Sequence, residues 1–174
     1  MIDYNVFREF GEAITHLGEM AAPTDMAPAQ RVQRAKEVMR EKIDRSLAID
    51  LEACVHCGYC SEACQYYVQT NDPQYTPTYK LDLLRRVYRR EMAPLNFIHR
   101  LYTREITADE LEAWQALCYD SCTECGRCTV ACPMGINIAR GVNVMRQALS
   151  AAGLVPAELR AVQQEQDNRG TVFG

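Results

Sequence analysis

The chain has 174 residues, of which 48% are apolar and 24% charged, a composition typical of a folded globular protein rather than a disordered one. Its formal net charge of −4 and pI near 5.4 argue against nucleic-acid binding, which needs a strongly basic face. No apolar run approaches the roughly 18 residues of a membrane-spanning helix, and the N-terminal residues lack the pattern of an export signal. We therefore expect a cytoplasmic protein.

The N-terminal third is predicted to be helical with one interruption. Apolar residues recur every three or four positions from Val6 to Leu17, which predicts an amphipathic helix. Residues 21–29 contain two prolines and are expected to form a linker. A second helix is expected from about residue 29 to residue 46, because Val32, Ala35, Met39 and Ile43 share one helical face.

Helices are also expected between and after the cysteine-rich stretches. Residues 80–92 have helical periodicity, and residues 96–102 form a short helical segment. Thr107 and Glu110 have the spacing of a capping box, which predicts the start of a helix.

In the C-terminal third, Asn137 can cap a further helix that ends near Gly153, and Pro156 suits the first turn of a last one. No segment has the alternating pattern of a strand, so the predicted fold class is all-α. The expected division is an N-terminal part over 1–46, a central domain over 47–153 and a C-terminal helix and tail over 154–174.

The nine cysteines are the most informative residues of the chain. An odd number cannot be fully paired in disulfides, and without an export signal thiols more often serve metals or redox chemistry. Two runs of four share the form Cys-x2-Cys-x2-Cys-x3-Cys, and 57 residues lie between them. The runs are Cys54, Cys57, Cys60 and Cys64, and Cys122, Cys125, Cys128 and Cys132, the second followed by Pro133.

This spacing is typical of bacterial [4Fe–4S] ligation, in which the fourth cysteine of each run ligates the other cluster. Three thiolates on a curling loop can each reach a different iron of one cube, and a helix starting at the fourth cysteine points its thiolate away from them. The predicted ligands of cluster 1 are Cys54, Cys57, Cys60 and Cys132. The predicted ligands of cluster 2 are Cys122, Cys125, Cys128 and Cys64. Two [4Fe–4S] clusters held in this way would carry single electrons.

Two glycines and two weaker alternatives bear on this interpretation. Gly58 and Gly126 follow the second cysteine of their runs and allow the backbone to curl so that N–H groups approach the cluster sulfurs. A zinc site is a weaker alternative, because zinc knuckles are usually paired across a longer gap. Two [2Fe–2S] centres are equally weak, because the plant-type spacing differs.

Two further features leave alternatives open. Cys118, the ninth thiol, is expected to be a buried apolar residue, with a spare ligand or a redox-active thiol as the alternative. Four arginines, at positions 85, 86, 89 and 90, lie on one flank of the helix predicted over 80–92. They are expected to form a solvated face, with docking of an acidic partner or compensation of cluster charge as the alternative.

The helical insert between the two runs resembles the α-helical ferredoxin family, and in particular the small two-cluster iron–sulfur subunit of heterodisulfide reductase. The matching stretches are CVHCGYCSEAC, TPTYKLDLLRRVYRRE and CTECGRCTVACP, and the resemblance covers roughly residues 45–150. The first run departs from it by ending in Cys64-Gln65 rather than Cys-Pro, which puts the local turn in doubt.

The resemblance implies a non-catalytic, cytoplasmic electron relay in a hetero-oligomeric oxidoreductase complex. Its expected partners are a flavin-containing protein and a catalytic protein with CCG motifs, as in Hdr-like complexes of sulfur oxidation. One alternative is an iron–sulfur subunit of a membrane quinone-linked oxidoreductase. Another is a stand-alone disulfide-reducing enzyme that uses Cys118. No catalytic residue is assigned.

Overall fold

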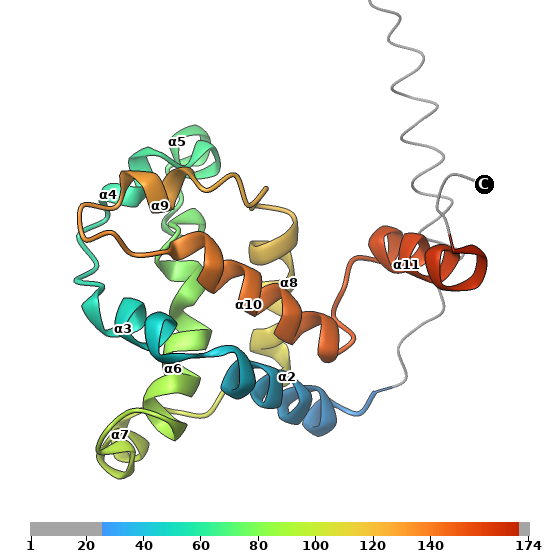
Figure 1. The fold of residues 1–174 in the computed structure, drawn as a ribbon, viewed down its shortest axis with the longest axis horizontal. Coiled ribbons are helices and arrows are strands. Elements are labelled where there is room, and N and C mark those ends of the chain that lie inside the picture. Colours follow the sequence, from blue (N-terminus) through green and yellow to red (C-terminus); the bar gives the residue numbers. More distant parts are fainter. Residues whose placement is uncertain (1–25, 171–174) are drawn as a thin grey trace, which may run out of the picture. The chain divides into compact units, whose positions relative to one another are not determined.

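A computed structural model describes residues 26–170, so the amphipathic helix expected between Val6 and Leu17 lies outside the described residues. Met26–Leu154 form one compact unit, and residues 155–170 belong to a second one. All regular elements in the described part of the chain are helices, which confirms the all-α prediction (Figure 1).

The helix expected over residues 29–46 is in fact two helices, α2 (Pro28–Lys42) and α3 (Arg45–Ala53). The backbone leaves the helical conformation at Ile43, whose ψ is 90°. Asp44 then caps α3, because its side chain accepts a hydrogen bond of 2.9 Å from the backbone N–H of Leu47. Because this N-cap lies so close to the end of α2, a new helix starts here and α2 does not continue. As a result, α3 ends immediately before Cys54.

The segment between the two cysteine runs is folded into short helices as well. After the first run come α5 (Gln65–Thr70) and two 3₁₀ turns, η1 (Pro73–Tyr75) and η2 (Tyr79–Leu81). The predicted helix over 80–92 comprises η2 and α6 (Asp82–Glu91), and the short helical segment is α7 (Asn96–Tyr102).

The predicted helix caps are present. The Thr107 hydroxyl accepts from the Glu110 backbone N–H and the Glu110 carboxylate accepts from that of Thr107, which forms the capping box of α8 (Ala108–Tyr119). The Asn137 side chain accepts from the backbone N–H of Arg140 at the start of α10 (Ile138–Ala151). Gly153 follows this helix with φ of 72°, and α11 (Ala157–Arg169) follows Pro156.

The core of the 26–154 unit lies around α10, which contacts α2, α3, α8 and η2 (Figure 1). Gly141 lets η2 approach α10 closely, since a Cβ at this position would lie 2.6 Å from the Cδ2 atom of Leu81. The largest fully buried apolar side chains are Met39, Leu47, Leu51, Leu81, Leu83, Leu84, Leu111, Ile138, Met145 and Leu149. This core connects the elements that carry the two cysteine runs.

The domain limits expected at residues 46 and 153 stay a prediction. α2, which that division assigned to the N-terminal part, packs on α10 within the 26–154 unit. None of the described helices has the length and apolar character needed to span a bilayer.

Candidate metal centres

The two cysteine loops have the same backbone conformation. Gly58 and Gly126 both have positive φ, at 78° and 75°, as their predicted role in curling the loop requires. His56 and Glu124, each two residues after the first cysteine of its run, also have positive φ, at 54° and 52°. The sequence analysis missed the positive φ of these two residues, although histidine is among the residue types that adopt positive φ more often than most.

Each loop leads into a short helix that carries the third cysteine. α4 (Tyr59–Glu62) holds Cys60 and α9 (Arg127–Ala131) holds Cys128, and the two helices contact each other. The repeat seen in the sequence is therefore a repeat in space, with its two copies packed together.

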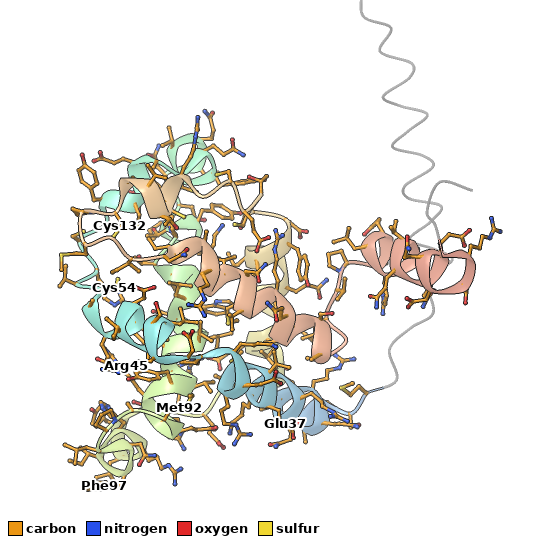
Figure 2. All side chains as sticks on the ribbon, viewed as in Figure 1. Glu37, Arg45, Cys54, Met92, Phe97 and Cys132 are labelled. Atoms are coloured by element: carbon orange, nitrogen blue, oxygen red, sulfur yellow. The ribbon has the colours of Figure 1, made fainter. Side chains whose placement is uncertain are left out.

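Two cavities lie beside these helices, and each is lined by four cysteines that come from both runs. The first cavity is lined by Cys54, Cys57, Cys60 and Cys132. The second cavity is lined by Cys64, Cys122, Cys125 and Cys128. Figure 2 shows Cys54 after α3 and Cys132 after α9 on the same side of the molecule. The structure thus brings together the residues of each predicted ligand set, and ligation itself stays a prediction.

The fourth cysteines occupy different local structures. Cys64 precedes α5 as its N-cap residue, as expected. The expectation of a helix starting at Cys132 is wrong, because Cys132 ends α9 and the next helix begins only at Ile138. The two cysteines have nearly the same backbone conformation, with ψ of 114° at Cys64 and 115° at Cys132, so the difference lies in the residues that follow. After Cys132 the chain forms a turn instead of a helix, because Gly135 has φ of 68° and its N–H donates to the carbonyl of Cys132 at 3.0 Å. Gln65, which replaces proline in the first run, is the first residue of α5.

Burial raises the pKa of several thiols. Desolvation raises the pKa of the Cys60 thiol, and it raises that of Cys128 to about 11. Cys57 and Cys125 are exposed. Cys118 is completely buried, its pKa is raised to about 12 by desolvation, and it does not occur in the lining of either cavity. This confirms the expectation that Cys118 is a buried residue.

Buried cations lie beside both cysteine loops. The Lys80 side chain is 2% exposed, lines the second cavity, and donates from Nζ to the carbonyl of Ser121, the residue before Cys122. Its Nζ also lies 5.5 Å from the centroid of the Tyr66 ring. Arg146 is a second cation beside this loop, since its Nη2 donates to the carbonyl of Cys122. The sequence analysis missed this role of Lys80, because helical periodicity alone assigns a lysine to the solvated side.

Arg85 lies near the first cysteine loop, in a cleft that is also lined by His56, but unlike Lys80 it does not line the cysteine cavity itself. It is 4% exposed and donates from Nε to the carbonyl of Leu51 at 3.3 Å, in the last turn of α3. The expectation of a single solvated arginine face is therefore wrong for Arg85. Arg90 also leaves that face, since it donates to the carbonyl of Thr103.

The donor sets suit [4Fe–4S] clusters. Each cavity offers four thiols, and the two residues with positive φ in each loop bend the backbone around its cysteines. Across residues 26–170, no three His, Cys, Asp or Glu side chains converge on the position of a single metal ion. A cube does not need such convergence, because each of its four irons takes one thiolate.

Residues 50–136, half of the chain, match the family model described as a 4Fe-4S dicluster domain. The chain belongs to this family. This dicluster domain therefore binds [4Fe–4S] clusters, as predicted, rather than zinc or [2Fe–2S] centres, and it is an electron-transfer protein.

Two curated relatives support the predicted resemblance to Hdr-like iron–sulfur subunits. The dicluster chain is similar to the Hdr-like menaquinol oxidoreductase iron-sulfur subunit 2 of Archaeoglobus fulgidus, with 36% identity over 122 residues, 68% of this chain and 22% of the relative. It is also similar to the Hdr-like menaquinol oxidoreductase iron-sulfur subunit of Archaeoglobus profundus, with 31% identity over 113 residues, 64% of this chain and 20% of the relative. The matches thus span about a fifth of either relative. No solved structure matches the chain significantly.

Proposed function

We propose that this chain is an electron-transfer subunit with two [4Fe–4S] clusters in a multi-subunit, quinol-linked, Hdr-like oxidoreductase of the membrane. The support is that both relatives are named as menaquinol oxidoreductase subunits. The comparisons therefore favour the quinone-linked alternative over the relay between a flavoprotein and a CCG-motif protein. Cytoplasmic location stays a prediction.

The observation that supports two clusters with crossed ligands is the lining of the two cavities. Cluster 1 would be held by Cys54, Cys57, Cys60 and Cys132. Cluster 2 would be held by Cys64, Cys122, Cys125 and Cys128. When bound, a [4Fe–4S] cluster supplies reversible one-electron oxidation and reduction.

The chain's own part in this function is to position the two sites and to set their electrostatics. The contact between α4 and α9 fixes one cysteine loop against the other. Lys80 and Arg85 place buried positive charge beside the second and the first loop, where it favours the more negative, reduced state. Burial of Cys60 and of the apolar residues around it excludes water from one side of the first site.

Paired cysteine substitutions test the crossed ligation. The full chain, loaded with iron and sulfide under anaerobic conditions, is expected to hold about eight irons. The Cys57→Ala/Cys132→Ala variant removes two ligands of one cluster and is expected to keep about four irons. The Cys125→Ala/Cys132→Ala variant removes one ligand from each cluster and is expected to lose both. Uncrossed ligation would give the reverse result.

Purification of the complex tests the physiological assignment. The full chain, tagged in its native cells and extracted with mild detergent, is expected to co-purify with a membrane-embedded protein. Menaquinol added to that complex is expected to reduce the clusters. Recovery from the soluble fraction together with a flavoprotein would overturn the quinol-linked assignment and favour the relay.

The stand-alone disulfide reductase is the least supported alternative. A reducing thiol must be accessible and ionised, whereas Cys118 is buried and its pKa is raised to about 12.

A further inference from the structure

An arginine-rich cleft lies beside the first cysteine loop, outside the two cysteine-lined cavities. Its walls come from η2, α6, the segment Thr103–Arg104 and α8, and His56 of the cysteine loop lies at its edge. The charged residues in its lining are Asp82, Arg85, Arg86, Arg89, Arg104 and Glu110. The electron-transfer function described above uses Arg85 but gives no role to the other charged residues of this cleft.

The charges of the cleft do not balance. Four arginines face two carboxylates, which leaves a net charge of +2. Glu110 is shared by Arg86 at 2.9 Å and Arg104 at 2.6 Å. In the part of the chain that the structure describes, no carboxylate forms an ion pair with Arg89.

Arg85 is the innermost of these cations and lacks one acceptor. It is 4% exposed, whereas the side chain of Arg104, at the outer end, is 79% exposed. The Arg85 Nη1 atom donates to Asp82 at 2.9 Å and Nε to the carbonyl of Leu51, but Nη2 is buried without a hydrogen-bond acceptor. A buried charged donor without an acceptor is costly, so such groups are normally satisfied by a bound molecule or water.

We propose that this cleft is a binding site for a small, doubly charged oxyanion of the phosphate or sulfate type. Two negative charges match the net charge of the cleft. Planar guanidinium groups bind the oxygens of such anions in pairs, and an approach to Arg85 requires a compact group. Arg89 supplies the second contact, because no carboxylate competes for it. The acidic segment of a partner protein is the competing occupant.

Binding at this site has a consequence for the neighbouring cluster. His56 lies between Cys54 and Cys57 and also lines the cleft, so a bound anion lies beside the loop of cluster 1. Added negative charge disfavours the addition of an electron, and the anion therefore lowers the midpoint potential of cluster 1 more than that of cluster 2. By thermodynamic linkage, reduction of cluster 1 weakens anion binding. This second effect rests on the proposed function, whereas binding itself does not.

Calorimetric titration of the iron-loaded full chain with inorganic phosphate and with sulfate, at low and constant ionic strength, tests the site. Trp114 also lines the cleft and is the single tryptophan of the chain, so its fluorescence reports binding independently. Arg89→Gln is expected to weaken binding about tenfold or more, the effect of losing one charged hydrogen bond. Asp82→Asn is expected to tighten binding, because it raises the net charge of the cleft.

The matched control is Arg34→Gln, which removes an exposed arginine on α2 and is expected to leave the affinity unchanged. No saturable binding of phosphate or sulfate, or equal affinity in the Arg89→Gln variant, would overturn the proposal. An acidic peptide that binds while phosphate does not compete with it would overturn it in favour of partner docking. Anion binding without any shift of the cluster potentials would refute only the linkage to cluster 1.

Discussion

The glycines of the two cysteine loops allow a quantitative test of how the loops are held. Gly58 and Gly126 have φ of 78° and 75°, and a Cβ built on either would meet no atom within 4 Å. Replacement by alanine therefore adds no steric clash with the protein's own atoms, and its effect is expected to come from the backbone conformation. A non-glycine residue in this conformation costs about 1–2 kcal/mol, partly offset by the lower entropy of the unfolded alanine chain, about 0.4–1 kcal/mol.

The expected loss is thus about 1 kcal/mol for Gly58→Ala or Gly126→Ala, and about twice that for the double variant. For a chain of this size, each kcal/mol lowers the melting temperature by about 2–4 °C. The assay is thermal unfolding of the iron-loaded protein without oxygen, followed both by the helical circular dichroism signal and by the cluster absorbance.

Gly126→Asn is the control, because asparagine tolerates positive φ better than alanine does. It is expected to recover much of the stability that Gly126→Ala loses. Equal melting temperatures for the alanine and asparagine variants, or an alanine variant as stable as the original protein, would refute the reasoning.

Three further predictions concern single side chains. Lys80→Met removes a buried charge beside the second cavity and is expected to lower the midpoint potential of cluster 2 more than that of cluster 1, as measured by redox titration with electron paramagnetic resonance. Cys118→Ala is expected to keep the full iron content. The free energy of unfolding of this variant is also expected to fall less above pH 9 than that of the original protein. The reason is that the pKa of Cys118 is 9.0 in the unfolded chain and about 12 in the folded protein, so the thiol stabilises the original protein less and less as the pH rises from 9 to 12. Thr107→Ala removes the capping box of α8 and is expected to lower the free energy of unfolding by about 1 kcal/mol in denaturant titrations.

Each of these predictions has an outcome that contradicts it. Unchanged potentials in the Lys80 variant would mean that the lysine does not act on cluster 2. A loss of about four irons in the Cys118 variant would make that thiol a ligand. A Thr107 variant as stable as the original protein would mean that the cap contributes nothing measurable.

The helix starts and the type of cluster were predictable because both depend on residues close together in the sequence. The capping box of Thr107 and Glu110 and the cap at Asn137 involve partners three residues away, and the structure has both. The break between α2 and α3 has an equally local cause at Asp44, but the continuous apolar face of residues 32–43 outweighed it in the sequence interpretation.

What the sequence could not predict depends on contacts between distant segments. Lys80 is buried at a place where the carbonyl of Ser121, 41 residues later, accepts a hydrogen bond from its Nζ. Arg85 is buried because α6 packs where α3 ends, so that the carbonyl of Leu51 becomes its acceptor. Neither acceptor is visible in a periodicity pattern, which treats charged residues as solvated.

The shared lining of the cavities also bears on the order in which the protein can mature during synthesis. Cys54 leaves the ribosome long before Cys132, yet both line the same cavity. Neither pocket has its full set of thiols until residues 122–132 have been translated and α9 has packed against α4. A nascent chain that ends before these residues therefore has free cysteines but cannot hold either cluster with four thiols.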